Sequence, residues 1–73
     1  MELKRKLIAG RFGTVPGRIT LAFKNQAAEY HIRRDQPRIG PILAALAESW
    51  SRGEEIEVTL SGAEVVDARK VSP

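Results

Sequence analysis

The stretch Arg34–Gly53, RDQPRIGPILAALAESWSRG, has a helical periodicity, and segments with strand-like alternation lie on both sides of it. At 100° per residue its large apolar side chains fall on one stripe, while Glu48 points away from it. Gly40-Pro41 favours a helix start, because proline is tolerated at the first helical position. Gly53 can adopt the left-handed conformation that ends a helix. The pattern predicts a helix over residues 40–52. Its core-facing side chains would be Ile42, Leu46 and Trp50.

Five segments that alternate apolar and polar residues surround this helix, which predicts β-strands. The first segment is irregular, since Leu3 and Leu7 share one phase. Ile8 and Phe12 share the other phase, and Gly10 lies between the two pairs. A phase switch beside a glycine predicts one long strand bent by a bulge. Turns are expected at 16–17, 25–26 and 61–62. The remaining strands are expected over 18–24, 27–33, 55–60 and 63–71.

The order strand, strand, strand, helix, strand, strand resembles the OB-fold superfamily. An OB-fold is a five-stranded Greek-key barrel with one helix between strands three and four. Its first strand is long and bent by a glycine or a bulge, a role that Gly10 fits. The resemblance implies a mainly β, single OB-fold-like domain over residues 1–71, followed by a short tail at 72–73. The rival folds are an SH3-like barrel, which lacks a helix of this length at this point, and an α+β sandwich with the helix covering a flat five-stranded sheet.

Length and composition restrict the classes of protein. Seventy-three residues suffice for one small domain with a marginal core. The absence of cysteine excludes disulfides, thiolate metal sites and thiol nucleophiles. No apolar run approaches the roughly 18 residues of a membrane span, and the apolar stretch after Met1–Lys6 is too short for a signal peptide. We therefore expect a cytoplasmic protein that does not bind membranes.

The sequence offers little for catalysis or metal binding. His31 is the one histidine, and no serine lies in a nucleophile elbow. His31 with Glu29 and Asp35 lacks the usual spacing of zinc ligands. The acidic run Glu54–Glu57 is more typical of a solvated strand edge than of a cation site, and Gly10–Gly13 lacks the spacing and the following helix of a phosphate loop. We expect no enzyme activity, no metal and no cofactor.

Basic side chains gather in the first half of the chain. Residues 1–38 carry nine basic and three acidic side chains, a formal charge of +6, whereas residues 39–73 carry three and six, a formal charge of −3. In OB-folds the ligand groove crosses the second and third strands, so the resemblance places the groove in the basic half, as phosphate tracking requires. We expect Lys24, Arg33 and Arg34 to lie close together. The candidate nucleic-acid-binding residues are Lys4, Lys6, Arg11, Arg18, Lys24, His31, Arg33 and Arg34.

Two classes of binding module remain open. The strand and helix phases assign Phe23, Tyr30 and Trp50 to the core, which leaves Phe12 and His31 for stacking and argues against a strong single-strand binder. The first class is a binder of duplex or structured RNA or DNA through phosphates. The alternative is a protein-interaction or homo-oligomerising module, either a weak, salt-sensitive homodimer or a component of a larger complex, that uses exposed edge strands. Because the basic half and the expected groove coincide, nucleic acid is slightly favoured.

Overall fold

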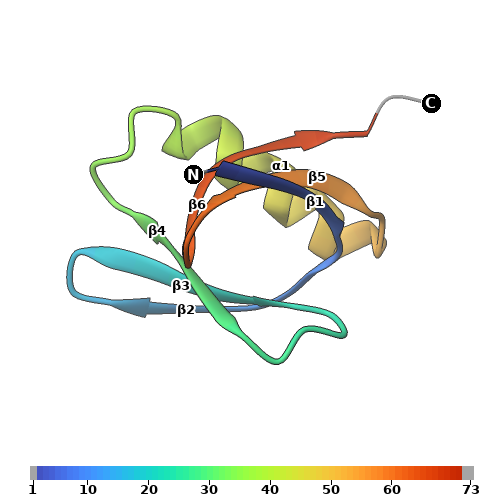
Figure 1. Cartoon of the computed structure of the whole chain (residues 1–73), viewed down its shortest axis with the longest axis horizontal. Coiled ribbons are helices and arrows are strands. Elements are labelled where there is room, and N and C mark those ends of the chain that lie inside the picture. Colours follow the sequence, from blue (N-terminus) through green and yellow to red (C-terminus); the bar gives the residue numbers. More distant parts are fainter. Residues whose placement is uncertain (1, 72–73) are drawn as a thin grey trace.

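A computed structural model describes residues 2–71, which form six β-strands and one α-helix (Figure 1). The tail expected at 72–73 lies outside the described residues. Among residues 2–71 no helix has the length and apolar character needed to cross a membrane. The elements are β1 (Glu2–Leu7), β2 (Ala9–Val15), β3 (Arg18–Phe23), β4 (Glu29–Arg33), α1 (Ile39–Arg52), β5 (Ile56–Ser61) and β6 (Glu64–Lys70).

The strands form one mixed sheet in the order β1-β5-β6-β4-β3-β2. Neighbouring strands are antiparallel except β4 and β6, which are parallel, with His31 in register with Glu64. The two edge strands, β1 and β2, are consecutive in the chain and are separated only by Ile8. The sheet is therefore strongly curved, and Figure 1 shows β1 and β2 on opposite sides of it, joined at one end by the Ile8 segment. No strand pairing joins β1 to β2 within the described residues, so the sheet is open.

The predicted five-stranded, closed OB-fold-like barrel is therefore wrong. The sheet has six strands, and the helix lies between β4 and β5 instead of between a third and a fourth strand. The expected long first strand is two strands because its hydrogen-bonding partner changes at Ile8. Before this residue β1 pairs with β5, and after it β2 pairs with β3. The two halves of the expected first strand, β1 and β2, thus form the two edges of an open sheet.

The bulge predicted beside Gly10 is confirmed. The register of β2 against β3 shifts between Ala9 and Arg11, which flank this glycine. A Cβ atom at Gly10 would lie only 2.8 Å from the carbonyl oxygen of Ala22. Because backbone atoms cannot move aside as a flexible side chain can, only glycine allows β2 and β3 to approach so closely here.

The predicted helix is confirmed with a start one residue earlier, and it ends at Gly53 with φ of +66°. Ile42 and Leu46 are buried as expected. The placement of Trp50 in the core is wrong, because this side chain is 59% exposed and Ser49 takes the third buried position. The Ala9 backbone N–H donates to Ser49 Oγ at 3.0 Å, and this hydroxyl donates to the carbonyl of Glu54 at 2.6 Å. A satisfied hydroxyl can be buried at little cost, and it ties α1 to the start of β2.

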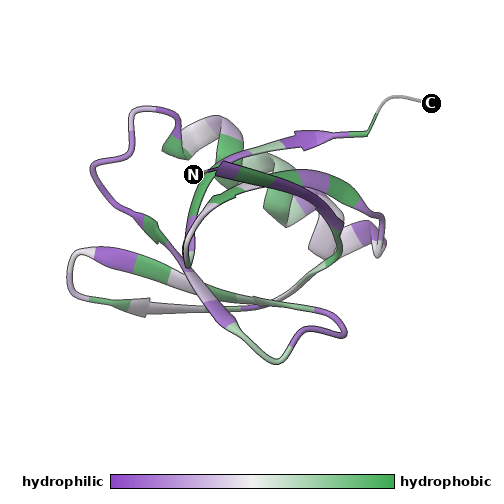
Figure 2. Ribbon diagram, viewed as in Figure 1, coloured by the Kyte–Doolittle hydropathy of each residue, from purple (hydrophilic) through white to green (hydrophobic). Residues whose placement is uncertain are grey.

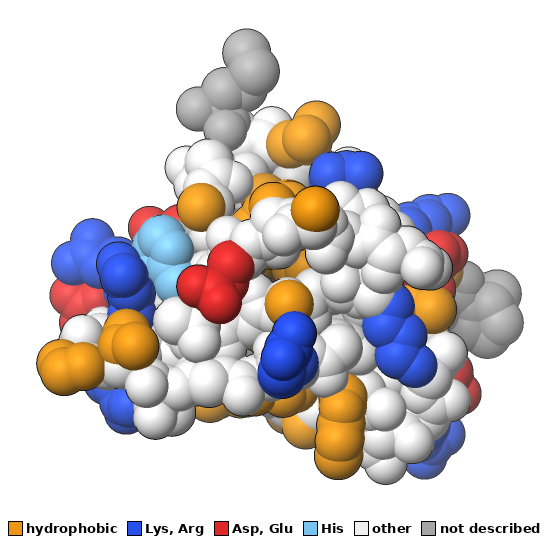
Figure 3. All heavy atoms as spheres, turned by 90° about the horizontal axis from the view of Figure 1, so that it is seen from below, with side chains coloured by type: hydrophobic (Ala, Val, Ile, Leu, Met, Phe, Trp, Pro, Cys, Tyr) orange, Lys and Arg blue, Asp and Glu red, His pale blue; other side chains and the backbone are white. Residues whose placement is uncertain are grey.

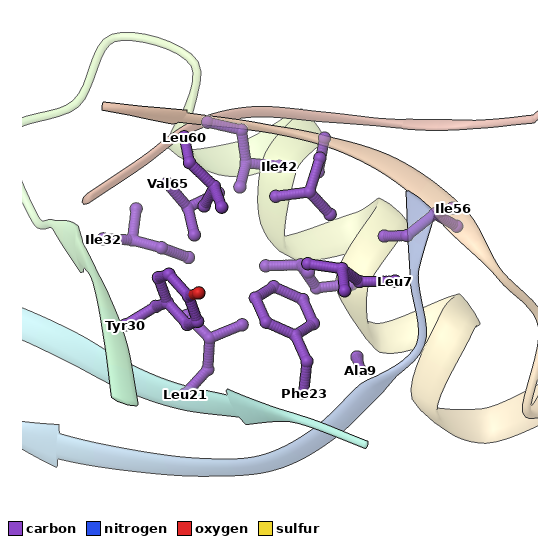
Figure 4. Packing of buried hydrophobic residues seen from close by; sticks show 13 residues of the cluster. Leu7, Ala9, Leu21, Phe23, Tyr30, Ile32, Ile42, Ile56, Leu60 and Val65 are labelled. Carbon is purple, nitrogen blue, oxygen red and sulfur yellow. The ribbon is translucent and has the colours of Figure 1, made fainter. Parts of the chain in front are cut away.

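The hydrophobic core fills the inside of the curved sheet, and α1 covers one side of it (Figure 4). Hydrophobic and hydrophilic residues alternate along the strands (Figure 2). The rings of Phe23 and Tyr30 meet edge to face with centroids 5.4 Å apart, which confirms that both aromatics belong to the core. The buried hydrophobic residues are Leu7, Ala9, Leu21, Phe23, Tyr30, Ile32, Ile42, Leu46, Ile56, Val58, Leu60, Val65 and Ala68.

Candidate nucleic-acid interface

The outward surface of β2, β3 and β4 carries most of the predicted site. Directly opposite residues on antiparallel strands share a face of the sheet. Leu21 and Phe23 point into the core, so the alternate positions of β3, and the residues in register with them on either side, point outward. We call this surface the β2–β4 face. Its residues are Arg11, Gly13, Val15, Arg18, Thr20, Ala22, Glu29, His31 and Arg33.

A shallow hollow of about 270 Å³ lies toward the end of the β2–β4 face that carries Arg11. The small residues Gly13, Thr20 and Ala22 line it together with Arg11 and Glu29. A Cβ atom at Gly13 would lie 2.7 Å from Thr20 Oγ1, so glycine keeps this part of the surface low. Figure 3 shows the molecule from below, with separated basic groups, the histidine, acidic groups and hydrophobic side chains scattered over a largely white surface of backbone and other side chains.

An in-register pair of arginines lies at one end of the β2–β4 face. Arg18 of β3 is directly opposite Arg33 of β4, and both are exposed. Like charges that face each other across two strands destabilise a sheet. One carboxylate compensates the pair, since Arg33 donates to Asp35 at 2.9 Å. Within residues 2–71 Arg18 forms no ion pair, so this end of the face has an excess of positive charge.

Arg34 lies next to this pair, whereas Lys24 does not. The Arg34 backbone N–H donates to the carbonyl of Gly17 at 3.2 Å, which holds it beside the β2–β3 turn. Lys24 follows β3 at the opposite end, six residues from Arg18, a separation of roughly 20 Å at the usual rise per strand residue. The expected proximity of Lys24 to Arg33 and Arg34 is therefore wrong. The antiparallel register places Arg18, not Lys24, beside Arg33.

Lys4 and Lys6 lie on β1, at the other edge of the sheet from β2. Lys6 is in register with Glu57 of β5, which is in register with Arg69 of β6. We call this second outward surface the β1–β6 face. Its residues are Lys4, Lys6, Glu57, Thr59, Asp67 and Arg69. Of the eight predicted site residues, the structure thus brings six to the β2–β4 face or its ends and separates the two β1 lysines from them.

Opposite charges are matched on the β1–β6 face. Arg69 contacts Asp67 at 2.7 Å, and Arg38 Nε lies 3.4 Å from the other oxygen of the same carboxylate. The hydrogen bond from Arg69, aided by a backbone hydrogen bond and by the charge of Arg38, holds the pKa of Asp67 below its ordinary value despite partial burial. Beside this face, Lys70 of β6 forms an ion pair with Glu48 of α1 at 2.5 Å, and this contact lowers the pKa of Glu48.

His31 is half-buried near the middle of the β2–β4 face. It lies between Thr20 of β3 and Glu64 of β6, and its backbone N–H donates to the carbonyl of Ala63 at 2.9 Å. In the described part of the chain no group of three histidine, cysteine, aspartate or glutamate side chains is arranged to hold a metal ion. The position suits a contact with a bound ligand at the surface.

Aromatic side chains are missing from the β2–β4 face as far as the structure describes it. Phe23 and Tyr30 are buried, Phe12 lies on the inner side of β2 opposite Leu21 with 38% exposure, and Trp50 is on α1. Sequence reasoning missed Gly13 as part of the site. Its signal was a second glycine within a strand segment, which often marks the close approach of another backbone or a ligand.

No family model, no curated protein and no solved structure matches this chain. The expected relationship to the OB-fold superfamily therefore finds no support from these comparisons, and the strand count and open sheet contradict it.

Proposed function

We propose that this protein is a non-catalytic module that binds nucleic acid through phosphate contacts on the β2–β4 face. The observation that carries the proposal is the in-register pair of Arg18 and Arg33, of which only Arg33 contacts a carboxylate, that of Asp35. Guanidinium groups bind phosphate oxygens with two parallel N–H donors. A phosphate placed over the pair removes the repulsion that the free protein retains, and Arg34 lies close enough in the chain to contribute at the same end.

The arrangement favours phosphates over bases. A stacked base is worth about 1–3 kcal/mol in single-strand binders, and the described β2–β4 face has no aromatic side chain to supply this contact. Arg11 and Lys24 extend the basic residues along β3, away from Arg18. The span of roughly 20 Å matches the rise of about six nucleotides along one strand of a duplex. Duplex or structured RNA is recognised mainly by such backbone contacts.

The salt dependence of binding tests this proposal. For the wild type we expect about three to five phosphate contacts, and therefore a linear fall of log K with log salt at roughly −0.9 per contact on a duplex. Replacing Arg18 and Arg33 together with alanine should reduce the slope by roughly 1.5–2. Sequence preference should change little, because phosphate contacts position a protein without reading bases. Fluorescence anisotropy with labelled RNA and DNA duplexes gives these slopes.

The matched control removes the same charge from the other face. Replacing Lys4 and Lys6 with alanine also deletes two exposed basic groups, but both lie on β1. This variant should keep nearly the wild-type slope. Equal losses of slope in both double variants would show that net charge, not the β2–β4 face, governs binding. A wild type that binds no duplex at about 50 mM salt, where such contacts are strong, would refute the proposal.

A further inference from the structure

The two edges of the open sheet differ in how they are protected from pairing. The β1 edge has three consecutive exposed cations, Lys4, Arg5 and Lys6, and charged side chains on edge strands prevent association with other strands. The β2 edge has one charged residue, Arg11, and exposes Phe12 and Val15, each to 38%. Within residues 2–71 β2 pairs only with β3, so its outer backbone groups have no strand partner.

We propose that β2 pairs antiparallel with β2 of a second copy of this chain, with Phe12 of each copy opposite Phe12 of the other. The distribution of charge favours this pairing over the other edge pairings of two copies. Pairing β1 with β1 places the cations of β1 beside one another, pairing β1 with β2 adds Arg11 to the three cations of β1, and like charges directly opposite each other are unfavourable. Of the possible edge pairings between two copies, the β2 with β2 pairing avoids this juxtaposition.

The register follows from the sequence of β2, AGRFGTV. With Phe12 on the two-fold axis, Arg11 lies opposite Gly13 of the second copy, and Thr14 lies opposite Gly10. Arg11 and Thr14 therefore each meet a glycine, and Gly13 adjoins the hollow of the β2–β4 face, which leaves room for the guanidinium. A register centred on Arg11 would instead oppose two guanidinium groups. Aromatic pairs across two strands are among the stabilising cross-strand pairs.

The dimer also extends the site, a consequence that rests on the proposed function. Opposite residues share a face, so the β2–β4 faces of the two copies become neighbours in one continuous sheet. Arg11 of each copy then lies near the boundary, and the two basic surfaces form one longer track. A single pair of short edge strands buries less area than a standard interface, so we expect a dissociation constant on the order of 100 μM.

Sedimentation velocity without nucleic acid tests the dimer. The wild type should change from monomer to dimer between about 20 μM and about 1 mM, the range of weak interfaces. Phe12→Lys and Phe12→Glu should each remain monomeric, and an equimolar mixture should dimerise again, because positions 12 face each other. Leu3→Lys is the matched control, since Leu3 is an exposed hydrophobic residue (58%) on the β1 edge. It should dimerise like the wild type.

Several results would overturn the inference. These are a wild type that stays monomeric at about 1 mM, a Phe12→Lys variant that dimerises normally, or a mixture of the two folded Phe12 variants that stays monomeric. Circular dichroism establishes that each variant is folded. Each copy carries a net charge of +3, so added salt should strengthen this dimer slightly. A dimer that salt dissociates would indicate pairing of oppositely charged surfaces instead.

The two proposals fail separately. If the wild type dimerises through Phe12 but binds no duplex, the β2 pairing stands and the nucleic-acid function is wrong. If the wild type never dimerises, but it and Phe12→Lys both bind duplex with an affinity that falls with salt, the nucleic-acid function stands and the β2 pairing is wrong. Should both be correct, Phe12→Lys should lose the cooperativity of wild-type binding while keeping its phosphate contacts.

Discussion

The two outward faces of the sheet both carry charged side chains, but they differ in how these charges are paired across the strands. On the β1–β6 face Lys6, Glu57 and Arg69 alternate in sign across three strands, and Asp67 lies between two arginines. On the β2–β4 face Arg18 faces Arg33, with one exposed carboxylate at Asp35 to compensate them. The first face therefore places its carboxylates next to cations, whereas the second places two cations in register, an arrangement that an anion from outside would stabilise.

This difference shows that the charge of a segment of sequence does not determine the charge of a surface. The first half of the chain contains both β1 and the β2–β4 strands, and its formal charge is strongly positive. The sheet order places β1 beside β5 of the acidic half. Lys6 of β1 thereby lies opposite the carboxylate of Glu57, whereas Arg18 and Arg33 of the β2–β4 face lie opposite each other.

The largest expected effect concerns the core that supports both faces. Leu46 is fully buried, so Leu46→Ala should lower the free energy of unfolding by roughly 2–5 kcal/mol, which is much of the stability of so small a domain. Trp50→Ala, on the same helix, removes a larger but 59% exposed side chain and should change stability by less than about 1 kcal/mol. Urea denaturation followed by circular dichroism measures both. A greater loss in Trp50→Ala would mean that the indole is buried after all.

The same charge reversal on each face should give stability changes of opposite sign. Arg18→Glu replaces a repulsive pair with an attractive one opposite Arg33, so the melting temperature should rise by roughly 1–5 °C. Lys6→Glu places a carboxylate opposite Glu57 and should lower it by a similar amount. Thermal melts at low salt measure the two shifts. Arg18→Glu should at the same time weaken duplex binding, and changes of equal sign in both variants would remove the contrast between the faces.

The smallest expected effect is a dependence on acid pH that belongs to the β1–β6 face. The pKa of Asp67 lies below its ordinary value of 3.8, so ionisation of this carboxyl group favours the folded state. Its contribution is complete above the unfolded-state pKa and is lost as the pH falls through the lower folded-state pKa. Asp67→Asn should therefore have a lower melting temperature than the wild type near neutral pH. The difference in melting temperature between this variant and the wild type should become smaller in strong acid.

Glu29→Gln is the matched control on the β2–β4 face, because Glu29 forms no ion pair in the part of the chain that the structure describes. Its melting temperature should stay close to that of the wild type across the same pH series. If Asp67→Asn differs from the wild type by a constant amount at all pH values, its effect is one of packing, and the contact with Arg69 contributes nothing.

Local features of the sequence predicted the elements well. The helix over 40–52, its glycine end and the bulge beside Gly10 each depend on residues that are close together in the chain. The structure has all three. The turns expected at 16–17, 25–26 and 61–62 lie within one residue of those observed at 16–17, 24–25 and 62–63. The exception within the helix is Trp50, because periodicity could not show that the Ser49 hydroxyl would find partners at Ala9 and Glu54.

By itself the sequence determined which segments are extended, which is the helix, and that arginine and lysine concentrate before residue 39. These properties depend on side-chain periodicity, turn chemistry and composition, all of which are local. Only the tertiary structure decided that Ile8 divides the first strand, that the sheet stays open, and that β1 lies beside β5. Strand order depends on hydrogen bonds between residues far apart in the chain, for which a single sequence carries little local signal, whereas the register within a hairpin follows from its turn.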